Sequence, residues 1–254
     1  FFFAFEFFCS MFGRLATSAA VLGCGGVMYA ATNPSVPLHA KSFWDASPAI
    51  VSYQREPENS HLKIWLAKKG VMSAVGHNLV IKVHDWQSNM KMTPDGDCEL
   101  EVEVDAASLA VESHWKPAKK PENGIEGIRG QKVEIHEMDN WSIGQIHGTM
   151  RSKEVLEVAK YPKVTYKGKG KKSAEGFHFE GTMNLHGTDA DLALDSVITV
   201  EADKSGMPYF VMKGETIFPM TKWGIKPVSA LMGALQLKDE ICAKWEVHFV
   251  AKTE

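Results

Sequence analysis

The sequence predicts an all-β protein, an eight-stranded antiparallel barrel with short helices, preceded by an N-terminal membrane helix. Three observations support this. About eight runs after residue 60 alternate apolar and polar residues, the period of a strand with one buried and one solvated face. Few helical patterns interrupt these runs. Of the first 32 residues, 22 are apolar and only Glu6 and Arg14 are charged, so the hydrophobic content of 44% averages two unlike parts.

The N-terminal part is long enough to cross a bilayer. Leu15–Thr32 contains no charged residue, and eighteen helical residues rise about 27 Å, close to the thickness of a hydrocarbon core. We therefore expect a membrane-anchoring segment over 1–33, a proline-containing linker over 34–58 and a barrel domain over 59–254. The alternative is a retained targeting sequence, which has a similar apolar centre.

The strands follow from the alternation of side chains. In the run 98–104, Cys98 and Leu100 share one face, whereas Glu99 and Glu101 lie on the other. The predicted strands are 62–66, 79–83, 98–104, 163–169, 176–185, 191–200, 209–218 and 241–250. Eight such strands form a barrel or a sandwich, and an eight-stranded barrel can hold one small ligand.

Three short helices and one long loop are expected between the strands. The helices are predicted at Ala106–His114, Ser152–Ala159 and Ser229–Leu235. Residues Trp115–Lys132 are polar and rich in Pro and Gly, which is typical of a loop.

The composition argues against several functions. A net charge of -3, from 28 basic and 31 acidic residues, does not indicate a nucleic-acid binder. The sequence has no His-Glu-x-x-His, no Gly-x-Ser-x-Gly, no phosphate-binding loop and no CxxC, so neither a metal site nor a catalytic site is expected. By alternation Cys98 points into the barrel and Cys242 points outward, which predicts no disulfide between them.

Six lysines lie close together between Lys160 and Lys172. They indicate either a solvated hairpin protected against edge pairing, or a surface that contacts anionic lipid head groups or an acidic partner.

A family resemblance is carried by three segments: GVMSAVGHNLVIKVHDW (70–86), RSKEVLEVAKYPKVTYKGKG (151–170) continuing into FEGTMNLHGTDADLAL (179–194), and TKWGIKPVSALMGALQLKDEI (221–241). In order and spacing they resemble the YceI-like family, in its branch with a Gly-His-Asp/Asn-Leu motif. The resemblance covers about residues 60–250. It implies a lipocalin-like barrel whose interior holds a long isoprenoid chain or quinone tail, without a catalytic site.

The chain departs from the family pattern at Asn78, Lys222 and Trp223, and the bulk of Trp223 is expected to narrow the pocket. His77, in the Gly-His-Asn-Leu turn, is expected either to contact a ligand head group or to stabilise the turn.

The predicted ligand contacts are the apolar side chains that face the barrel interior. They are Ile64, Leu66, Leu79, Ile81, Leu100, Val102, Tyr166, Phe177, Phe179, Leu192, Leu194, Phe210, Met212, Trp223, Trp245, Val247 and Phe249. From the residues alone, the alternative is that these side chains fill a solid core. No cofactor is required, and the expected bound molecule is a polyisoprenoid or ubiquinone.

The predicted function is non-catalytic binding of an isoprenoid or quinone at a membrane, as a subunit of a membrane complex of the respiratory type. The alternative is a purely structural accessory subunit with no bound lipid. The expected location is the mitochondrial inner membrane with the barrel in the intermembrane space, and a bacterial periplasm or a plastid is the alternative.

Overall fold

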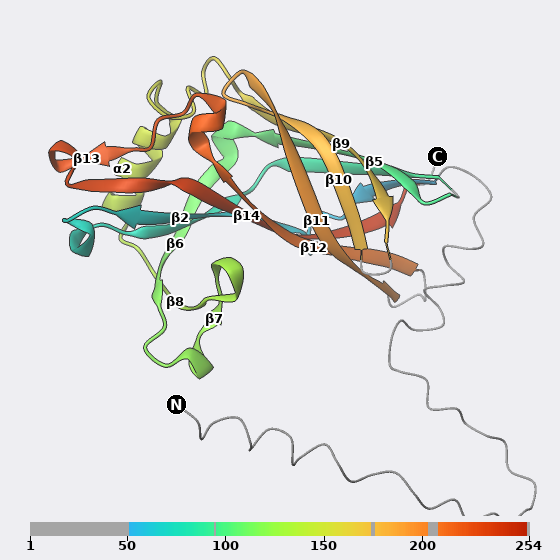
Figure 1. Cartoon of the computed structure of the whole chain (residues 1–254), viewed down its shortest axis with the longest axis horizontal. Coiled ribbons are helices and arrows are strands. Elements are labelled where there is room, and N and C mark those ends of the chain that lie inside the picture. Colours follow the sequence, from blue (N-terminus) through green and yellow to red (C-terminus); the bar gives the residue numbers. More distant parts are fainter. Residues whose placement is uncertain (1–50, 94, 174–175, 203–207, 253–254) are drawn as a thin grey trace, which may run out of the picture. The chain divides into compact units, whose positions relative to one another are not determined.

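The computed structural model describes residues 51–93, 95–173, 176–202 and 208–252 (Figure 1). The predicted membrane-anchoring segment 1–33 lies outside these residues. Within them, no helix is both long enough and apolar enough to cross a membrane.

Strands dominate, and they belong to one antiparallel sheet. The strands are β1 (Val51–Arg55), β2 (His61–Lys69), β3 (Asn78–Val83), β4 (Trp86–Met92), β5 (Asp97–Asp105), β6 (Leu109–Pro117), β7 (Ile125–Glu126), β8 (Lys132–His136), β9 (Lys163–Lys172), β10 (Gly176–Leu185), β11 (Thr188–Ala202), β12 (Pro208–Pro219), β13 (Ser229–Ala230) and β14 (Leu235–Ala251). The α-helix is α2 (Asn140–Arg151), and the short 3-10 turns are η1 (Ser73–Val75), η2 (Ala106–Ser108), η3 (Pro121–Asn123), η4 (Ile128–Gly130), η5 (Met220–Trp223) and η6 (Leu231–Gly233).

Eight strands close into a barrel. Their order around the ring is β1, β4, β5, β9, β10, β11, β12 and β14, and pairing between β14 and β1 closes the ring. One edge of β14 pairs with β12, whereas the other edge pairs with β2 and then with β1. The predicted eight-stranded antiparallel barrel is therefore confirmed.

Three of the barrel strands are bent and continue as a second segment. The two segments β1 and β2 run along the same edge of β14, and they pair with β4 and β3 respectively. His84 and Asp85 separate β3 from β4, and η2 separates β5 from β6. Each bend therefore lets one strand contribute one segment to the closed ring and the other segment to an open extension of the same sheet.

Beyond these bends the ring opens, and we call this the open end. β5 pairs with β9 as far as Asp105 and Lys163, after which β6 pairs with β8 instead. Helix α2 lies at this end (Figure 1) and packs Ile143, Ile146 and Met150 against the core. These positions share one face of the helix because they are three, four and seven residues apart.

A second apolar cluster lies outside the barrel, beneath β7, η4 and β8. Trp65, Val80, Trp115, Val133 and Cys242 form it. Two bonds attach the covering segment to the barrel wall: the Lys244 ammonium donates to the Gly127 carbonyl, and the Arg129 amide donates to Glu215. The outer cluster therefore holds the segment that sequence analysis treated as a loop.

All eight predicted strands are strands in the structure, and six of them belong to the closed ring, whereas the ring strands β1 and β4 were not predicted. The first three lie in β2, β3 and β5, and the other five lie in β9, β10, β11, β12 and β14. The predicted linker 34–58, however, contains β1. Its side chain Tyr53 is only 4% exposed and belongs to the core, so the barrel begins at Val51 rather than at residue 59.

The three predicted helices are wrong. Ala106–His114 forms η2 and most of β6, because β3 offers it a ladder partner that the local sequence does not reveal. Ser229–Leu235 forms β13, η6 and the first residue of β14, and Ser152–Ala159 forms turns. The helix α2 lies directly before Ser152–Ala159. It contains Gly144 and Gly148, which lower its intrinsic helical preference.

The outer cluster predicts a specific stability effect. Val133→Ala removes two methyl groups from a side chain that is 1% exposed, so the free energy of unfolding should fall by about 1–3 kcal/mol. Urea denaturation measures this loss. Ile135→Ala, on the same strand and 41% exposed, is the matched control and should change stability far less. Equal effects of the two substitutions would contradict the described packing of β8.

Candidate ligand cavity

A cavity of about 200 Å³ lies inside the barrel, and its surface is almost wholly apolar. Side chains from all the ring strands except β1, and from β2, β3 and β6, line it. Val155 and Leu156, from the segment after α2, and Met220 and Ile225, at η5, complete the lining. Apolar cavities of about 150 Å³ stay dry and can take up a benzene-sized guest. The barrel is therefore not packed solid, and its free space suits a hydrocarbon.

Glycines in the wall make room for two large aromatic rings. Tyr166 lies across Gly168 and Gly181, where a Cβ atom would collide with its ring. Trp245 lies against Gly214 in the same way. The Tyr166 hydroxyl reaches across the wall and donates to the Leu192 carbonyl at 3.2 Å. Because the rings lie along the wall rather than across the barrel, space remains at its centre.

A cation supports the aromatic wall near the bend between β1 and β2. The Arg55 guanidinium lies 4.3 Å from the centre of the Trp86 ring. It also donates a hydrogen bond of 2.5 Å to the Trp86 carbonyl. Trp86 lines the cavity, so Arg55 fixes one wall residue from behind.

The end of the barrel where β1 pairs with β14, the closed end, is filled by aromatic side chains. Phe210 and Phe249 stack with ring centres 5.0 Å apart, and Tyr53 meets Phe210 edge-on at 4.8 Å. Phe210 and Phe249 are fully buried. The cavity therefore stops short of this end.

Some polar groups of the lining are bonded within the wall, and others have no hydrogen-bond partner in the described part of the chain. The Ser196 hydroxyl donates to the Phe177 carbonyl, and the Thr216 hydroxyl to the Ala193 carbonyl. Ser88 Oγ and Trp245 Nε1 are buried lining atoms that have no hydrogen-bond partner among the described residues.

All the predicted ligand contacts belong to the apolar core, and ten of them line the cavity. The ten are Ile64, Leu100, Val102, Tyr166, Phe179, Leu192, Leu194, Met212, Trp245 and Val247. The others lie in the surrounding core: Leu66, Leu79, Ile81, Phe177, Phe210, Trp223 and Phe249. Their role in binding stays a prediction.

Trp223 does not line the cavity. It packs edge-on against Phe218, and its indole nitrogen donates to the Met183 carbonyl at 2.8 Å. Lining residues that sequence analysis missed include Trp86 and Ser88 of β4, and Val155 and Leu156. The alternation of Trp86, Ser88, Met90 and Met92 was the signal that could have revealed β4.

His77 lies outside the cavity lining, in a row of histidines at the open end. Its ring is 4.9 Å from that of His114, which stacks on His136 at 5.1 Å. Burial, followed by the neighbouring charges of His77 and His136, lowers the pKa of His114. The next residue, Asn78, accepts from the Lys68 amide and donates to the Trp115 carbonyl. An aspartate could not make both bonds, so the departure from the family pattern ties this turn to two strands.

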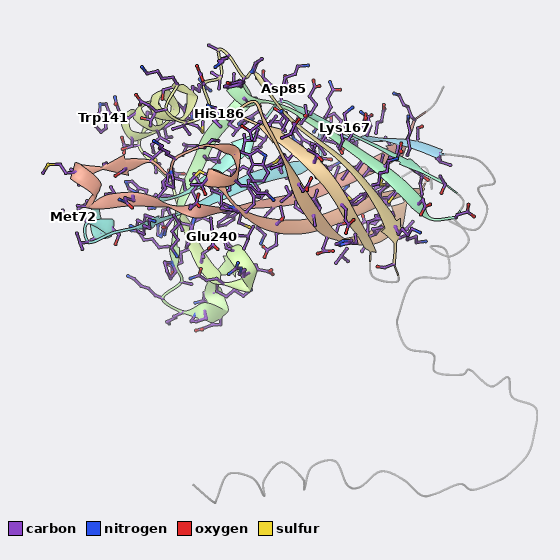
Figure 2. The ribbon with its side chains drawn as sticks, turned by 45° about the horizontal axis from the view of Figure 1, so that its top comes forward. Met72, Asp85, Trp141, Lys167, His186 and Glu240 are labelled. Carbon is purple, nitrogen blue, oxygen red and sulfur yellow. The ribbon has the colours of Figure 1, made fainter. Side chains whose placement is uncertain are left out.

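The lysines of β9 face the acidic strand β5. Their ammonium groups pair across the strands: Lys163 with Glu103 at 2.6 Å, Lys167 with Glu101 at 3.2 Å, Lys169 with Glu99 at 3.3 Å and Lys171 with Asp97 at 3.6 Å. Figure 2 shows Lys167 on the outside of the barrel. This charge ladder favours the solvated-hairpin interpretation, because the positive charge is balanced locally.

The described residues contain no group of three or more His, Cys, Asp or Glu side chains arranged to hold a metal ion. Cys98 and Cys242 are both buried and free. Cys98 belongs to the core cluster and Cys242 to the outer cluster, as the alternation predicted.

Comparisons with known proteins agree with this architecture. The sequence model of the YceI-like domain matches residues 53–249. No curated protein sequence matches the chain. Among solved structures, BcnA of Burkholderia cenocepacia is similar with a TM-score of 0.51 and 10% identity, over 76% of this chain and 98% of that one. The YceI protein of Campylobacter jejuni has a TM-score of 0.47 and 15% identity, over 68% of this chain and 85% of that one. At 10% identity the likeness to BcnA concerns the fold alone.

The contact between Gly214 and Trp245 can be tested by mutation. In Gly214→Ala the new Cβ would meet the indole and the Asp195 carbonyl, so the free energy of unfolding should fall by about 1–3 kcal/mol. Gly148→Ala in α2 is the control. Nothing lies within 4 Å of its Cβ position, so stability should rise by about 0.5–1 kcal/mol. A Gly214→Ala variant as stable as the parent protein would mean that the indole lies elsewhere.

The buried thiols predict a loss of stability in alkali. Burial raises the pKa of Cys98 and of Cys242 to about 12, whereas an exposed thiol titrates near 8.5. Their contribution is complete below the unfolded pKa and is lost as the pH rises from about 8.5 towards 12, because the unfolded chain releases these protons first. Urea midpoints measured across this range should fall, and replacing both cysteines with alanine should flatten the fall. Alkylation of either thiol in the native protein at neutral pH would disagree with their burial.

Proposed function

The chain belongs to the YceI-like family, and from this premise we propose that its barrel binds the apolar tail of an isoprenoid or related lipid without catalysing a reaction. Barrels of this family are known to bind isoprenoid or lipid-like ligands. The observation that carries the proposal for this chain is the apolar cavity at the centre of the barrel.

The chemistry of the cavity favours a hydrocarbon tail. Each buried methylene contributes about 0.8 kcal/mol, so a tail needs no polar anchor to bind. A charged or strongly hydrated head group would find almost no polar surface inside, because the lining is almost wholly apolar and offers little beyond Ser88 Oγ and Trp245 Nε1 to bond it. The tail is therefore expected inside the barrel and the head group outside it, towards the open end.

The volume limits how much tail fits without movement. A cavity of about 200 Å³ has room for about one or two isoprene units, judged by the benzene-sized guests of similar cavities. A longer tail requires wall side chains to shift or part of the chain to remain outside. Met183, Met212 and Met220 line the cavity, and their unbranched side chains adapt to new shapes more readily than branched ones.

The same small volume favours a second candidate, a structural accessory subunit with no bound lipid. Pockets for drug-sized ligands usually measure about 300–1,000 Å³, larger than this cavity. Membrane anchoring by residues 1–33, a place in a respiratory complex and a mitochondrial location rest on sequence reasoning and remain proposals.

A cavity-filling substitution separates the two candidates. Leu194 lines the cavity, whereas Val197, on the same strand β11, is exposed on the outer face. Leu194→Trp should occupy the cavity and reduce co-purified lipid about tenfold or more, because a tail of several methylenes would lose its site. Val197→Trp should retain the lipid. Organic extraction and mass spectrometry of the purified proteins measure this, and circular dichroism confirms folding.

The parent protein decides the main question. Prenyl or other long-chain lipid in its extract, reduced in Leu194→Trp, supports the carrier. A parent protein that carries no lipid, and takes up none when incubated with a polyprenol, would sink the proposal and leave the structural subunit.

A further inference from the structure

Two neighbouring loops at the open end expose large apolar side chains. One loop contains η1 and joins β2 to β3, and the other contains η6 and joins β13 to β14. The Met72 amide donates to the Ala234 carbonyl at 2.9 Å, which holds the two loops together. We call the five exposed side chains the apolar tip: Val71, Met72, Val75, Leu231 and Met232. Val71 is 91% exposed and Met232 is fully exposed.

The backbone presents these side chains at a conformational cost. Leu231 and Met232 have φ values of 52° and 54°, in the left-handed region that glycine and asparagine favour. Neither side chain gains burial in return. Strained backbone of this kind persists where the surrounding fold imposes it, and it clusters at functional sites.

The charged side chains in the two segments that carry the apolar tip are all basic, unlike those of the rest of the chain. Residues 68–78 and 226–238 contain Lys68, Lys69, Lys226 and Lys238 and no acidic residue, although the whole chain has a net charge of -3. The Lys68 ammonium donates to the Gly76 carbonyl. Within the described part of the chain, no ion pair involves any of these four lysines. In contrast, four lysines of β9 each pair with an acidic side chain on β5.

A tryptophan adds to the same end of the molecule. Trp141, in the first turn of α2, is 75% exposed. Figure 2 shows Trp141 and Met72 at the same end, where Figure 1 places α2 and β13. Tryptophan beside aliphatic side chains and lysines is the combination that lies in the interface of a bilayer.

We propose that the apolar tip inserts into the interfacial region of an anionic lipid bilayer while Lys69, Lys226 and Lys238 contact the lipid phosphates. Exposed apolar side chains on two adjoining loops, flanked by lysines, suit the interface of an anionic lipid surface. The interaction needs neither a lipid in the cavity nor residues 1–33, so it stands or falls separately from the proposed function.

Hydrogen exchange on the full-length protein tests this locally. Amide exchange is followed by mass spectrometry in peptides covering 70–76 and 229–235, with vesicles of phosphatidylcholine alone or mixed with phosphatidylglycerol. We expect exchange in both peptides to slow about tenfold with the anionic vesicles and to change little with phosphatidylcholine alone. Because the measurement is local, attachment through another part of the chain does not imitate this result.

Matched variants identify the contacts. Leu231→Asp with Met232→Asp should abolish the protection and still fold, because aspartate tolerates the left-handed backbone better than leucine or methionine does. Val197→Asp, at an exposed apolar position on the barrel wall, should keep it. Replacing Lys69, Lys226 and Lys238 with glutamine should weaken vesicle binding at the tip about a hundredfold, from about fivefold per lysine.

The outcomes are decisive in both directions. Protection that requires anionic lipid and disappears in the Leu231→Asp, Met232→Asp variant supports the proposal. Amide exchange in the two loops that is not slowed by either kind of vesicle would overturn it. A protein would then be the partner to test at this surface. Protection that survives in the tip variant would also overturn it.

Discussion

The barrel depends on the backbone pairing of one long strand, β14. Its seventeen residues pair with β12 along one edge and with both β2 and β1 along the other. The β1 pairing closes the ring, whereas the β2 pairing carries the sheet on to the open end. The position of a residue along β14, and the face of the strand to which its side chain points, therefore decide what it contacts. Phe249 fills the closed end, Trp245 faces the cavity, and Cys242 faces the outer cluster.

The cavity depends on two things: the inward side chains that fill the barrel, and the glycines of the wall, which have no side chain. An eight-stranded barrel of this kind can be packed solid by its inward side chains. Here Gly168, Gly181 and Gly214 leave gaps in the wall, and the rings of Tyr166 and Trp245 lie in those gaps. The two rings thereby pack against the backbone of the wall and do not extend across the centre of the barrel. A tail in the remaining space would contact rings and methyl groups on all sides.

Much of the fold could be predicted from the sequence, because alternation states which side chains share a face. It identified six of the eight ring strands, together with β2 and β3, and the opposite directions of Cys98 and Cys242. Alternation does not show how far along the barrel axis an inward side chain lies. It therefore could not distinguish Phe210, at the closed end, from Val247, beside the cavity. Alternation also does not show which strands pair with one another. The lysines of β9 were assigned to the ladder with β5 only by the register, and β6 was mistaken for a helix without knowledge of β3.

The seam beyond Asp105 and Lys163, where β5 and β9 stop pairing, affects how the cavity exchanges its contents. At that place the wall is completed by Val155 and Leu156, which belong to no strand. The backbone amides of residues 152–161 donate to carbonyls between residues 149 and 157 and to no barrel strand. Displacing this segment would break no ladder bond of the sheet, but it would break the ion pair of Glu157 with His186 at 3.7 Å and the contact between the rings of Tyr161 and His186. Access to the interior at this place would depend on breaking these contacts and the apolar contacts of Val155 and Leu156, and not on unfolding the barrel strands.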